Sequence, residues 1–235
     1  MSELVQALVL VPFAYLLGTF PSARLVARRR DIDVHNEGSG NPGASNIFRL
    51  MGWKWGLLVL VLDIGKGALA AGIGAIVDDG FDGHRGAYIL GLSAVLGHVF
   101  PITRHFKGGR GVATSAGALA VPHPLVMVIT GIVWIAIARG LRRASVASVV
   151  AVVTFTVIVV ARGASWLDMT VVSVIAGLII IRHLKSLLRV VRGQEIGLRS
   201  DLESRGEATR RFDLSPRPDL ETEATPSSDA GEPPA

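Results

Sequence analysis

The chain has 235 residues, of which 50% are hydrophobic and only 18% are charged, and its mean hydropathy is positive. A soluble domain needs a more highly charged surface, so this composition places the chain in a lipid bilayer. The absence of cysteine excludes disulfides, thiolate metal sites and a cysteine nucleophile, and nothing else in the sequence resembles a zinc site. The net charge of +5 does not indicate nucleic acid, because most basic residues flank hydrophobic stretches.

Seven hydrophobic stretches predict an all-α polytopic membrane protein with seven transmembrane helices. A helix that crosses a bilayer core of about 30 Å needs about 20 residues. The fourth stretch has only eleven, so we expect it to borrow its flanks or to stop partway. Short membrane helices are tolerated where their ends face protein or water, and this one therefore indicates a site. The predicted spans cover residues 4–22, 55–77, 87–103, 111–121, 124–138, 144–161 and 166–181.

The basic residues of the connecting loops predict the orientation. Six lie within 24–54 and three each within 104–110 and 139–143, whereas 78–86 and 162–168 carry one arginine each. Cytoplasmic loops are enriched in Lys and Arg. The N-terminus is therefore expected outside, the C-terminus in the cytoplasm, and all the basic loops on the cytoplasmic face.

Two domains are predicted, a membrane domain over residues 1–199 and a cytoplasmic tail over 200–235. The tail contains nine acidic residues, four arginines and five prolines, with very few apolar residues. Such a composition buries too little apolar surface to fold, so we expect the tail to be disordered.

A glycine-rich loop is predicted at 38–49, between the first two spans. Its glycines let backbone N–H groups turn towards one anion, its Ser and Asn side chains add neutral hydrogen bonds, and the fork of Arg49 fits phosphate oxygens two at a time. This pattern predicts a phosphate site. Residues 38–43 also match a dinucleotide fingerprint, but an arginine run precedes them where a strand is required. Ordinary turn residues are the other alternative.

A second glycine-rich loop, in which Lys107 and Arg110 flank glycines, lies directly before the short fourth stretch. If Gly111 opens that helix, its free N–H groups and positive dipole end point at an anion held by the two cations. Basic residues that only mark the cytoplasmic side are the alternative, although topology does not require glycines between them. The loop predicts a second phosphate site.

A third basic cluster, residues 182–195, follows the last span. On a helix, His183 and Ser186 would lie near one face. A helix lying on anionic lipid would have the same composition, so a functional and an interfacial role both stay open.

Asp63 and Lys66 are one helical turn apart inside the second span, where charges are costly, and we expect a structural ion pair rather than catalytic groups. His98, near the cytoplasmic end of the third span, is expected to be hydrogen-bonded in the core. The other histidines before the last span are expected to be ordinary loop residues: His35, His84, His105 and His123.

The sequence lacks a nucleophile elbow, a Walker-type phosphate loop and paired carboxylates at catalytic spacing, and no histidine has an aspartate five residues later. Two phosphate sites without a strong base suit a reaction whose leaving group is already activated. An acyl phosphate is such a donor, because the enzyme then chiefly positions the reactants and stabilises charge.

Over nearly the whole of residues 1–200, the sequence resembles the acyl-phosphate-dependent glycerol-3-phosphate acyltransferase family, PlsY, of bacterial membranes. The motifs that carry the resemblance are Gly18-Thr-Phe-Pro-Ser, Gly38-Ser-Gly-Asn-Pro-Gly-Ala-Ser-Asn with Arg49, Asp63, Lys66-Gly67, Gly97-His98 with Pro101, Lys107-Gly-Gly-Arg-Gly-Val-Ala-Thr114, and His183 with Glu195.

The resemblance implies transfer of a fatty acyl group from acyl phosphate to the 1-hydroxyl of sn-glycerol 3-phosphate, which is the first acylation of phospholipid synthesis. It implies neither metal nor other cofactor, and as partners the two substrates, membrane lipids and a functionally coupled enzyme that produces acyl phosphate. The implied catalytic residues are Ser39, Arg49, Lys107, Arg110 and His183. The implied substrate- and phosphate-binding residues are Gly38, Gly40, Asn41, Asn46, Gly108, Gly109, Gly111, Thr114, Ser186 and Glu195.

Two positions depart from the family pattern, since Arg110 stands where a lysine is usual and Ser186 where an asparagine is usual. Arginine presents a broad fork in place of a compact ammonium, and serine offers fewer hydrogen bonds than asparagine. These departures keep open a lipid-binding relative with weakened activity. The short fourth stretch and the paired phosphate loops keep open a transporter of a phosphate-bearing solute.

Overall fold

The structure, a computed structural model, describes residues 3–78 and 84–193, and all regular structure within these ranges is helical. The predicted all-α class is confirmed, whereas the predicted tail at 200–235 lies outside the described residues. The helices are α1 (Glu3–Gly18), α2 (Ser22–Arg28), α3 (Ala44–Met51), α4 (Trp53–Val77), α5 (Arg85–Val99), the 3-10 helix η1 (Ile102–Arg104), α6 (Val112–Ala120), α7 (Pro124–Leu141), α8 (Ala144–Ala161) and α9 (Trp166–Val191).

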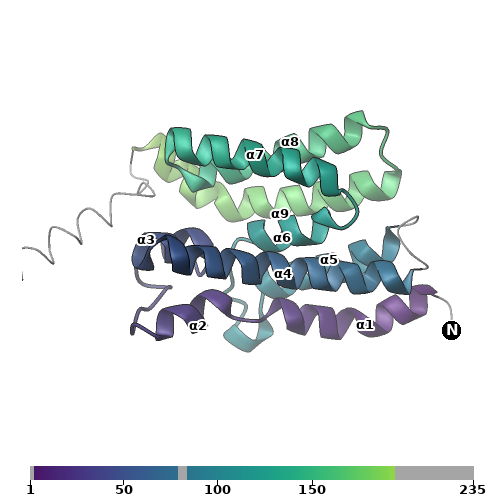
Figure 1. Cartoon of the computed structure of the whole chain (residues 1–235), viewed down its shortest axis with the longest axis horizontal. Helices are drawn as coiled ribbons and strands as arrows, with labels where there is room; N and C mark the ends of the chain where they lie inside the picture. The colour runs from purple at the N-terminus through teal and green to yellow at the C-terminus, as the bar shows by residue number, and fades with distance from the viewer. Residues whose placement is uncertain (1–2, 79–83, 194–235) are drawn as a thin grey trace, which may run out of the picture. The chain divides into compact units, whose positions relative to one another are not determined.

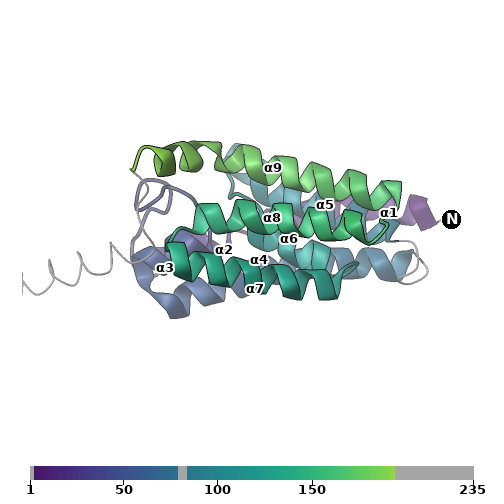
Figure 2. The same ribbon diagram turned by 90° about the horizontal axis from the view of Figure 1, so that it is seen from above.

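The long helices pack in two groups. Helices α1, α4 and α5 contact one another, with α2 and α3 against α4, while α8 lies between α7 and α9 in the second group. The short helix α6 contacts α4 and α5 on one side and α7 on the other, and α5 also contacts α9. Figures 1 and 2 show α6 between the two groups. Helix α6 therefore joins the two groups of helices.

Local sequence signals explain where these helices begin and end. Helix α8 is an uncharged run that ends at arginines on either side, Arg143 and Arg162. Helix α9 begins with a capping box, in which Ser165 and Asp168 satisfy each other's backbone N–H groups. Helix α7 has Pro124 in its first turn, where the missing N–H costs nothing.

Glycines allow α6 to pack directly on the backbone of α4. A Cβ atom on Gly67 would lie 2.0 Å from the carbonyl oxygen of Thr114, and one on Gly117 would lie 1.9 Å from that of Ile64. No side chain fits at either position without moving the helices apart. This contact fixes α6 against the middle of α4.

Six helical segments in the described ranges are long and apolar enough to span a membrane. They are Val5–Arg28, Trp53–Val77, Arg85–Arg104, Pro124–Leu141, Ala144–Ala161 and Trp166–Val191. The predicted fourth span is the nine-residue α6, which covers about 14 Å and is too short to cross alone. The seventh crossing and the predicted orientation of the termini therefore stay predictions.

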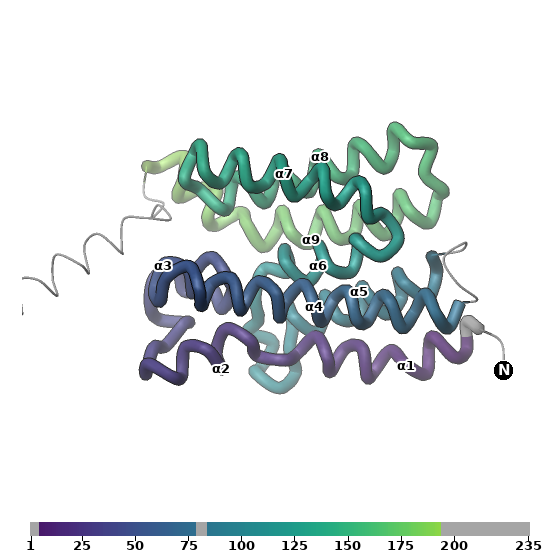
Figure 3. Tube along the Cα trace, in the orientation of Figure 1, coloured from purple at the N-terminus to yellow at the C-terminus, as the bar shows by residue number. Residues whose placement is uncertain are grey.

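The two end spans differ from their predicted limits. The predicted first span, 4–22, is broken after Gly18, because Thr19, Phe20 and Pro21 form a short non-helical link before α2. Figure 3 shows the break between α1 and α2. The predicted last span, 166–181, is wrong at its end, since α9 continues without a break to Val191. The basic residues after 181 are thus one end of a long helix and not a separate interfacial helix.

Candidate functional site

The first glycine-rich segment and the basic end of α9 lie at the same end of the helices, and the second glycine-rich loop contacts α9. Helix α3 leads directly into the start of α4, and α5 runs antiparallel to α4, since Gly86 packs on Gly74 and His98 bonds Lys66. The loop that follows α5 contacts the last turns of α9 through Arg182. In Figures 1 and 2, α3 and the yellow-green end of α9 lie at the same end.

The first predicted phosphate loop is half helix. Residues 38–43 lack regular structure, but Ala44 to Arg49 belong to α3, so the prediction of a loop throughout 38–49 is wrong. Gly38 and Gly40 have φ values of 60° and 69°, which favour glycine because a Cβ atom clashes there. The amphipathic α3 buries Ile47 and Leu50 against α2 and α4, and this packing orients the helix.

Asn46, predicted to contact a substrate, holds the loop together. Its Oδ1 accepts a hydrogen bond from the Ser39 backbone N–H at 2.8 Å, and its Nδ2 donates to the carbonyls of Val34 and Glu37 at 3.3 and 3.1 Å. The Asn46 side chain is completely buried. Its amide therefore orients the backbone at Ser39, and any contact of Asn46 with a ligand would have to replace one of these bonds.

The carboxylate of Asp33 orders the start of the same loop. Asp33 accepts hydrogen bonds from the His35 backbone N–H at 3.0 Å and from the Asn36 amide at 2.7 Å. These two bonds, with the first the stronger cause, hold the pKa of the Asp33 carboxyl below its usual range. The loop is thus fixed from both sides before any ligand binds.

Arg49 is only 5% exposed although it is charged, and it lies on α3 one turn after Asn46. Ser39 and Asn41 are half-buried beside the same loop. The structure brings Ser39 and Asn46 into contact, and it places Arg49 on the helix that follows.

The second glycine-rich loop packs tightly on the end of α5. The Gly109 N–H donates to the His98 carbonyl at 3.1 Å, and Cβ atoms on Gly108 and Gly109 would lie only 2.1 Å from the carbonyl oxygen and Nε2 of His98, respectively. Arg182 of α9 closes the loop, since its Nη2 donates to the carbonyls of Gly108 and Gly109 at 3.0 and 3.2 Å. Lys107 is exposed at the start of the loop.

Gly111 opens α6, as predicted, with φ at 87° and no side-chain cap on the helix. Thr114 and Ser115 lie in the first turn, and both hydroxyls are buried with no hydrogen-bond partner. Buried hydroxyls are normally paired, so two unpaired ones at a helix N-terminus suggest that a ligand belongs there. The free N–H groups of the first turn and the helix dipole favour an anion.

Arg110 and Ser186 lie in contact, although they are far apart in the sequence. The Arg110 Nη2 donates to the Ser186 Oγ at 2.5 Å, and Arg189 donates to the same oxygen at 3.2 Å. His183 is 2% exposed on the same helix, and its Nδ1 lies 2.8 Å from the Ile179 carbonyl oxygen. A carbonyl only accepts, so Nδ1 carries the proton, and Nε2 of the neutral ring is an acceptor.

The ion pair predicted inside α4 is confirmed. Lys66 Nζ lies 2.8 Å from Asp63 Oδ1, and Ser22 Oγ donates to the same oxygen at 2.5 Å. Lys66 also donates to His98 Nδ1 at 2.8 Å, which confirms that His98 is hydrogen-bonded in the core. Gly109 packs on the His98 ring. The buried cluster of Asp63, Lys66 and His98 therefore supports the second glycine-rich loop.

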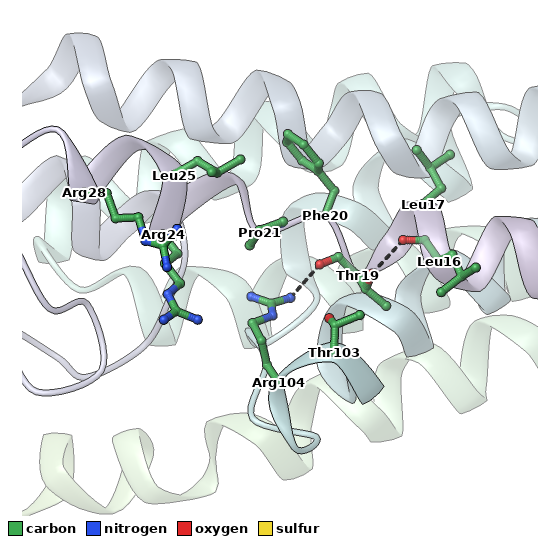
Figure 4. A pocket seen from close by; sticks show the side chains of 10 residues that line it. All are labelled: Leu16, Leu17, Thr19, Phe20, Pro21, Arg24, Leu25, Arg28, Thr103 and Arg104. Carbon is green, nitrogen blue, oxygen red and sulfur yellow. Dashed lines mark hydrogen bonds between the residues drawn. The ribbon is translucent and has the colours of Figure 1, made fainter.

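A cavity of about 400 Å³ opens beside the link between α1 and α2. Figure 4 shows its mixed lining, with Arg24 and Arg28 of α2 on one side and Arg104 reaching towards Thr19, whose carbonyl accepts its hydrogen bond at 2.9 Å. The apolar part of the lining is Leu16, Leu17, Phe20, Pro21 and Leu25. A cavity with both features suits an amphiphile that carries an anionic group.

Sequence reasoning missed two groups of residues. Arg182 was not predicted as a site residue, although it is spaced by one helical turn from Ser186, which could have indicated a shared face. His84 and His123 lie outside helices as predicted, but they are not ordinary loop residues, since both are within 3.6 Å of Asp168. Glu195, predicted to bind substrate, lies outside the described residues.

Comparison with known proteins gives one consistent result. The family described as glycerol-3-phosphate acyltransferase matches residues 8–193. A glycerol-3-phosphate acyltransferase of Aquifex aeolicus is 38% identical over 193 residues, which cover 81% of this chain and 98% of the relative. The corresponding protein of Bacillus cytotoxicus is 36% identical over 80% of this chain and 92% of its own length.

Two solved structures share the fold and the sequence. One is the crystal structure of PlsY, an integral membrane glycerol 3-phosphate acyltransferase, in its glycerol 3-phosphate form, with a TM-score of 0.77 and 38% identity. The other is the lysophosphatidic acid form of PlsY, with a TM-score of 0.74 and 37% identity. Each covers 82% of this chain and 95% of the solved chain.

Proposed function

Because the chain belongs to the glycerol-3-phosphate acyltransferase family, we propose that it transfers a fatty acyl group from acyl phosphate to the 1-hydroxyl of sn-glycerol 3-phosphate. The ester bond forms as the acyl–phosphate bond breaks, and the products are 1-acyl-sn-glycerol 3-phosphate and inorganic phosphate. The observation that carries the proposal is the glycine-rich turn before α6, where cations, unpaired buried hydroxyls and a helix N-terminus lie together.

The turn before α6 is assigned to one phosphate group. Lys107 and Arg110 supply charge and Thr114 supplies a hydroxyl. The backbone N–H groups of Gly108 and Gly111 add hydrogen bonds, whereas that of Gly109 is bonded to His98. Arg182 supports this assignment, because its bonds to two loop carbonyls turn those carbonyls away from the anion. The helix dipole of α6 adds to the attraction.

The second phosphate group is assigned to the segment that ends in Arg49. Glycines with left-handed backbone let the chain approach the anion closely, and Ser39 adds a hydroxyl. Arg49 lies on the helix that follows, and its planar guanidinium can bind two phosphate oxygens at once, which supports Arg49 as the binding group. That both segments lie at one end of the helices supports a shared site.

The chemistry requires positioning more than a strong base. The departing phosphate is proposed to take the proton of the acceptor hydroxyl, because no paired carboxylates lie in the described part of this site. The Nδ1 of His183 is bonded to the Ile179 carbonyl, and its Nε2 is proposed to accept a hydrogen bond from the other hydroxyl of the acceptor, which does not react, and so to position the acceptor. Arginine forks stabilise the charge that develops on the transferred group's oxygens.

The cavity beside α2 is proposed to receive the acyl phosphate. Leu16, Phe20 and Leu25 suit the start of an acyl chain, while Arg24 and Arg104 suit its phosphate. The cavity also borders η1, which leads directly into the turn at Lys107. The donor could then pass its phosphate to that turn without leaving the membrane.

Seven crossings are proposed, with the N-terminus outside, the C-terminus in the cytoplasm and the site at the cytoplasmic face of the cell membrane. The loop after α5 turns back to His98, so that α6 starts inside the fold and completes the fourth crossing. The basic residues at the ends of α7 and α9 support the orientation. Functional coupling to an enzyme that produces acyl phosphate fits this placement.

The decisive assay supplies purified full-length protein with acyl phosphate and labelled glycerol 3-phosphate. We expect lysophosphatidate and phosphate in equal amounts, with little product from a thioester donor of the same chain length. Folded protein that yields no product above a blank would reject the enzyme. Uptake of unmodified solute into proteoliposomes would then favour a transporter, while neither activity would leave a lipid-binding relative.

A further inference from the structure

A cluster of four polar side chains lies at the opposite end of the helices from the proposed site. His84 precedes α5, His123 precedes α7, and Asp168 lies in the first turn of α9, with Tyr88 of α5 among them. Asp168 and His183 are fifteen residues apart on α9, which corresponds to about 22 Å along the helix. The catalytic proposal therefore uses none of these residues.

The distances in the cluster match those of a metal site. His84 Nδ1 and His123 Nε2 each lie 3.6 Å from Asp168 Oδ1, and the three potential ligand atoms lie within 4.8 Å of one another. In a tetrahedral site with bonds of about 2.0–2.1 Å, the ligand atoms are about 3.4 Å apart. Small side-chain movements would thus bring all three onto one ion.

Neighbouring contacts hold the three ligands in place. The second carboxylate oxygen of Asp168 accepts hydrogen bonds from the Ser165 N–H at 2.9 Å and hydroxyl at 2.7 Å, and these direct Oδ1 towards the histidines. The His123 ring contacts Phe155 and His84 edge to face. Such supporting contacts are usual around metal ligands, since they fix ring orientation.

The cluster is hydrogen-bonded without an ion as well. The Tyr88 hydroxyl donates to Asp168 Oδ1 at 2.5 Å and lies 2.7 Å from His123 Nε2, so that this nitrogen must carry a proton that it donates to Tyr88. Metal binding at Nε2 would require the neutral ring to carry its proton on Nδ1 instead, and it would move the phenol aside. The His84, His123 and Asp168 side chains are 28%, 15% and 13% exposed, so an ion can reach them from solvent.

We propose that His84, His123 and Asp168 bind a zinc-type divalent cation, with water in the fourth position. Two imidazole nitrogens and one carboxylate oxygen are ligands that zinc prefers, whereas magnesium prefers oxygen alone. The ion would join the starts of α5, α7 and α9, which belong to both groups of helices. Its role would be to fasten the two groups together at the end remote from the proposed reaction.

The test compares two histidines whose φ values are both positive. His84 and His105 have φ values of 55° and 50°, and asparagine tolerates this left-handed region, so His84→Asn removes the ligand without adding strain. His105→Asn is the matched control, because His105 is exposed and follows η1 near the other end. Full-length protein in detergent, without an affinity tag and treated with a chelator, is titrated with Zn²⁺ and with Mg²⁺.

We expect wild type and His105→Asn to bind one Zn²⁺ with the same affinity and to gain thermal stability from it, and Mg²⁺ to have no effect. His84→Asn should bind Zn²⁺ at least about tenfold more weakly and lose the stabilisation. Equal Zn²⁺ affinity in His84→Asn and wild type, or no binding by wild type, would overturn the proposal and leave a hydrogen-bonded cluster only.

Cobalt provides a second measurement that needs no variant. Co²⁺ in a four-coordinate site of this kind absorbs visible light strongly, whereas six-coordinate Co²⁺ absorbs weakly, because geometry determines the spectrum. Strong bands in the wild type that one equivalent of Zn²⁺ removes would support the site. Weak absorption alone would count against it, whether or not His84→Asn folds.

Discussion

The guanidinium of Arg110 donates a hydrogen bond to the hydroxyl of Ser186, with 2.5 Å between Nη2 and Oγ. From the sequence, these two residues are expected to be departures from a lysine and an asparagine of the family pattern. Arginine is longer than lysine, and serine is shorter than asparagine, so the guanidinium of Arg110 can reach the hydroxyl of Ser186. The two departures form one contact, which suggests that each compensates for the other.

Exchanging both residues should therefore be milder than exchanging either one. We expect Arg110→Lys to lose the bond to Ser186, and Ser186→Asn to crowd the guanidinium, so that each lowers kcat/KM by about tenfold or more. The double variant should recover most of the activity, with a coupling free energy of about 1–3 kcal/mol in a double-mutant cycle. If the free-energy losses of the two single variants add in the double variant, the contact between Arg110 and Ser186 has no part in turnover.

Arg49→Ala should abolish turnover while the protein stays folded. The loss of a charged group that binds the transferred or acceptor phosphate typically costs a factor of about 100–1,000. Arg49→Lys should restore only part of the rate, because an ammonium cannot bind two oxygens in the plane of a fork. Arg139→Ala, at an exposed position near the end of α7, is the control. Near wild-type rates in Arg49→Ala would remove Arg49 from the site.

The cavity beside α2 makes a kinetic prediction. Arg24→Ala should raise the KM for acyl phosphate several-fold, with little change in the KM for glycerol 3-phosphate, because Arg24 lines the cavity that is proposed to receive the acyl phosphate. Arg30→Ala removes an exposed arginine outside the cavity and should leave both values unchanged. Equal increases of both KM values in Arg24→Ala would argue for general weakening of phosphate binding.

Lys66→Met should destabilise the protein strongly, since it leaves the Asp63 carboxylate buried beside Ser22 without its cation. Breaking a buried pair in this way costs about 3–5 kcal/mol. Adding Asp63→Asn removes the stranded charge while keeping a partner for Ser22, and should restore much of the loss. Unfolding in detergent micelles measures both effects. A double variant no more stable than Lys66→Met would show that the charge itself is not the cause.

Two neighbouring glycines of α4 should respond in opposite ways to alanine. In Gly67→Ala the new methyl group would meet the Thr114 carbonyl at 2.0 Å and push α6 away, at a cost of about 1–3 kcal/mol or more. Gly65→Ala faces open space and should leave the stability unchanged or slightly raised. Thermal unfolding of the two variants side by side is the measurement. Similar melting temperatures would contradict the tight α4–α6 contact.

The sequence was sufficient for elements whose signal is local. The predicted span 144–161 coincides with α8, because an uncharged run ends at an arginine on each side. The predicted end of the last span at 181 was wrong for a physical reason. Hydropathy falls at Arg182, but the helix continues, since Arg182 and Ser186 find partners on the loop after α5. Hydropathy alone contains no information about such partners.

The structure shows where the predicted site residues lie, while their contacts with substrate stay predictions. Asn46 resembled a ligand by residue type, yet its amide is occupied by three backbone groups of its own loop. His84, His123 and Asp168 come together only because three helices pack side by side. The spacing of these residues in the sequence does not predict that packing. The predicted topology could have grouped them, because each lies at the same end of its predicted span.

The position at which the short helix α6 begins determines how far into the fold an anionic group can bind. A full-length helix would begin at the water boundary, whereas α6 begins at Gly111, beside Val95 and Val99 within the fold. In the proposed reaction the phosphate of the donor is held at that beginning, and glycerol phosphate would have to enter the fold to meet it. In this proposed reaction, the water-soluble glycerol 3-phosphate therefore moves to the acyl phosphate. The acyl chain can remain in the bilayer throughout.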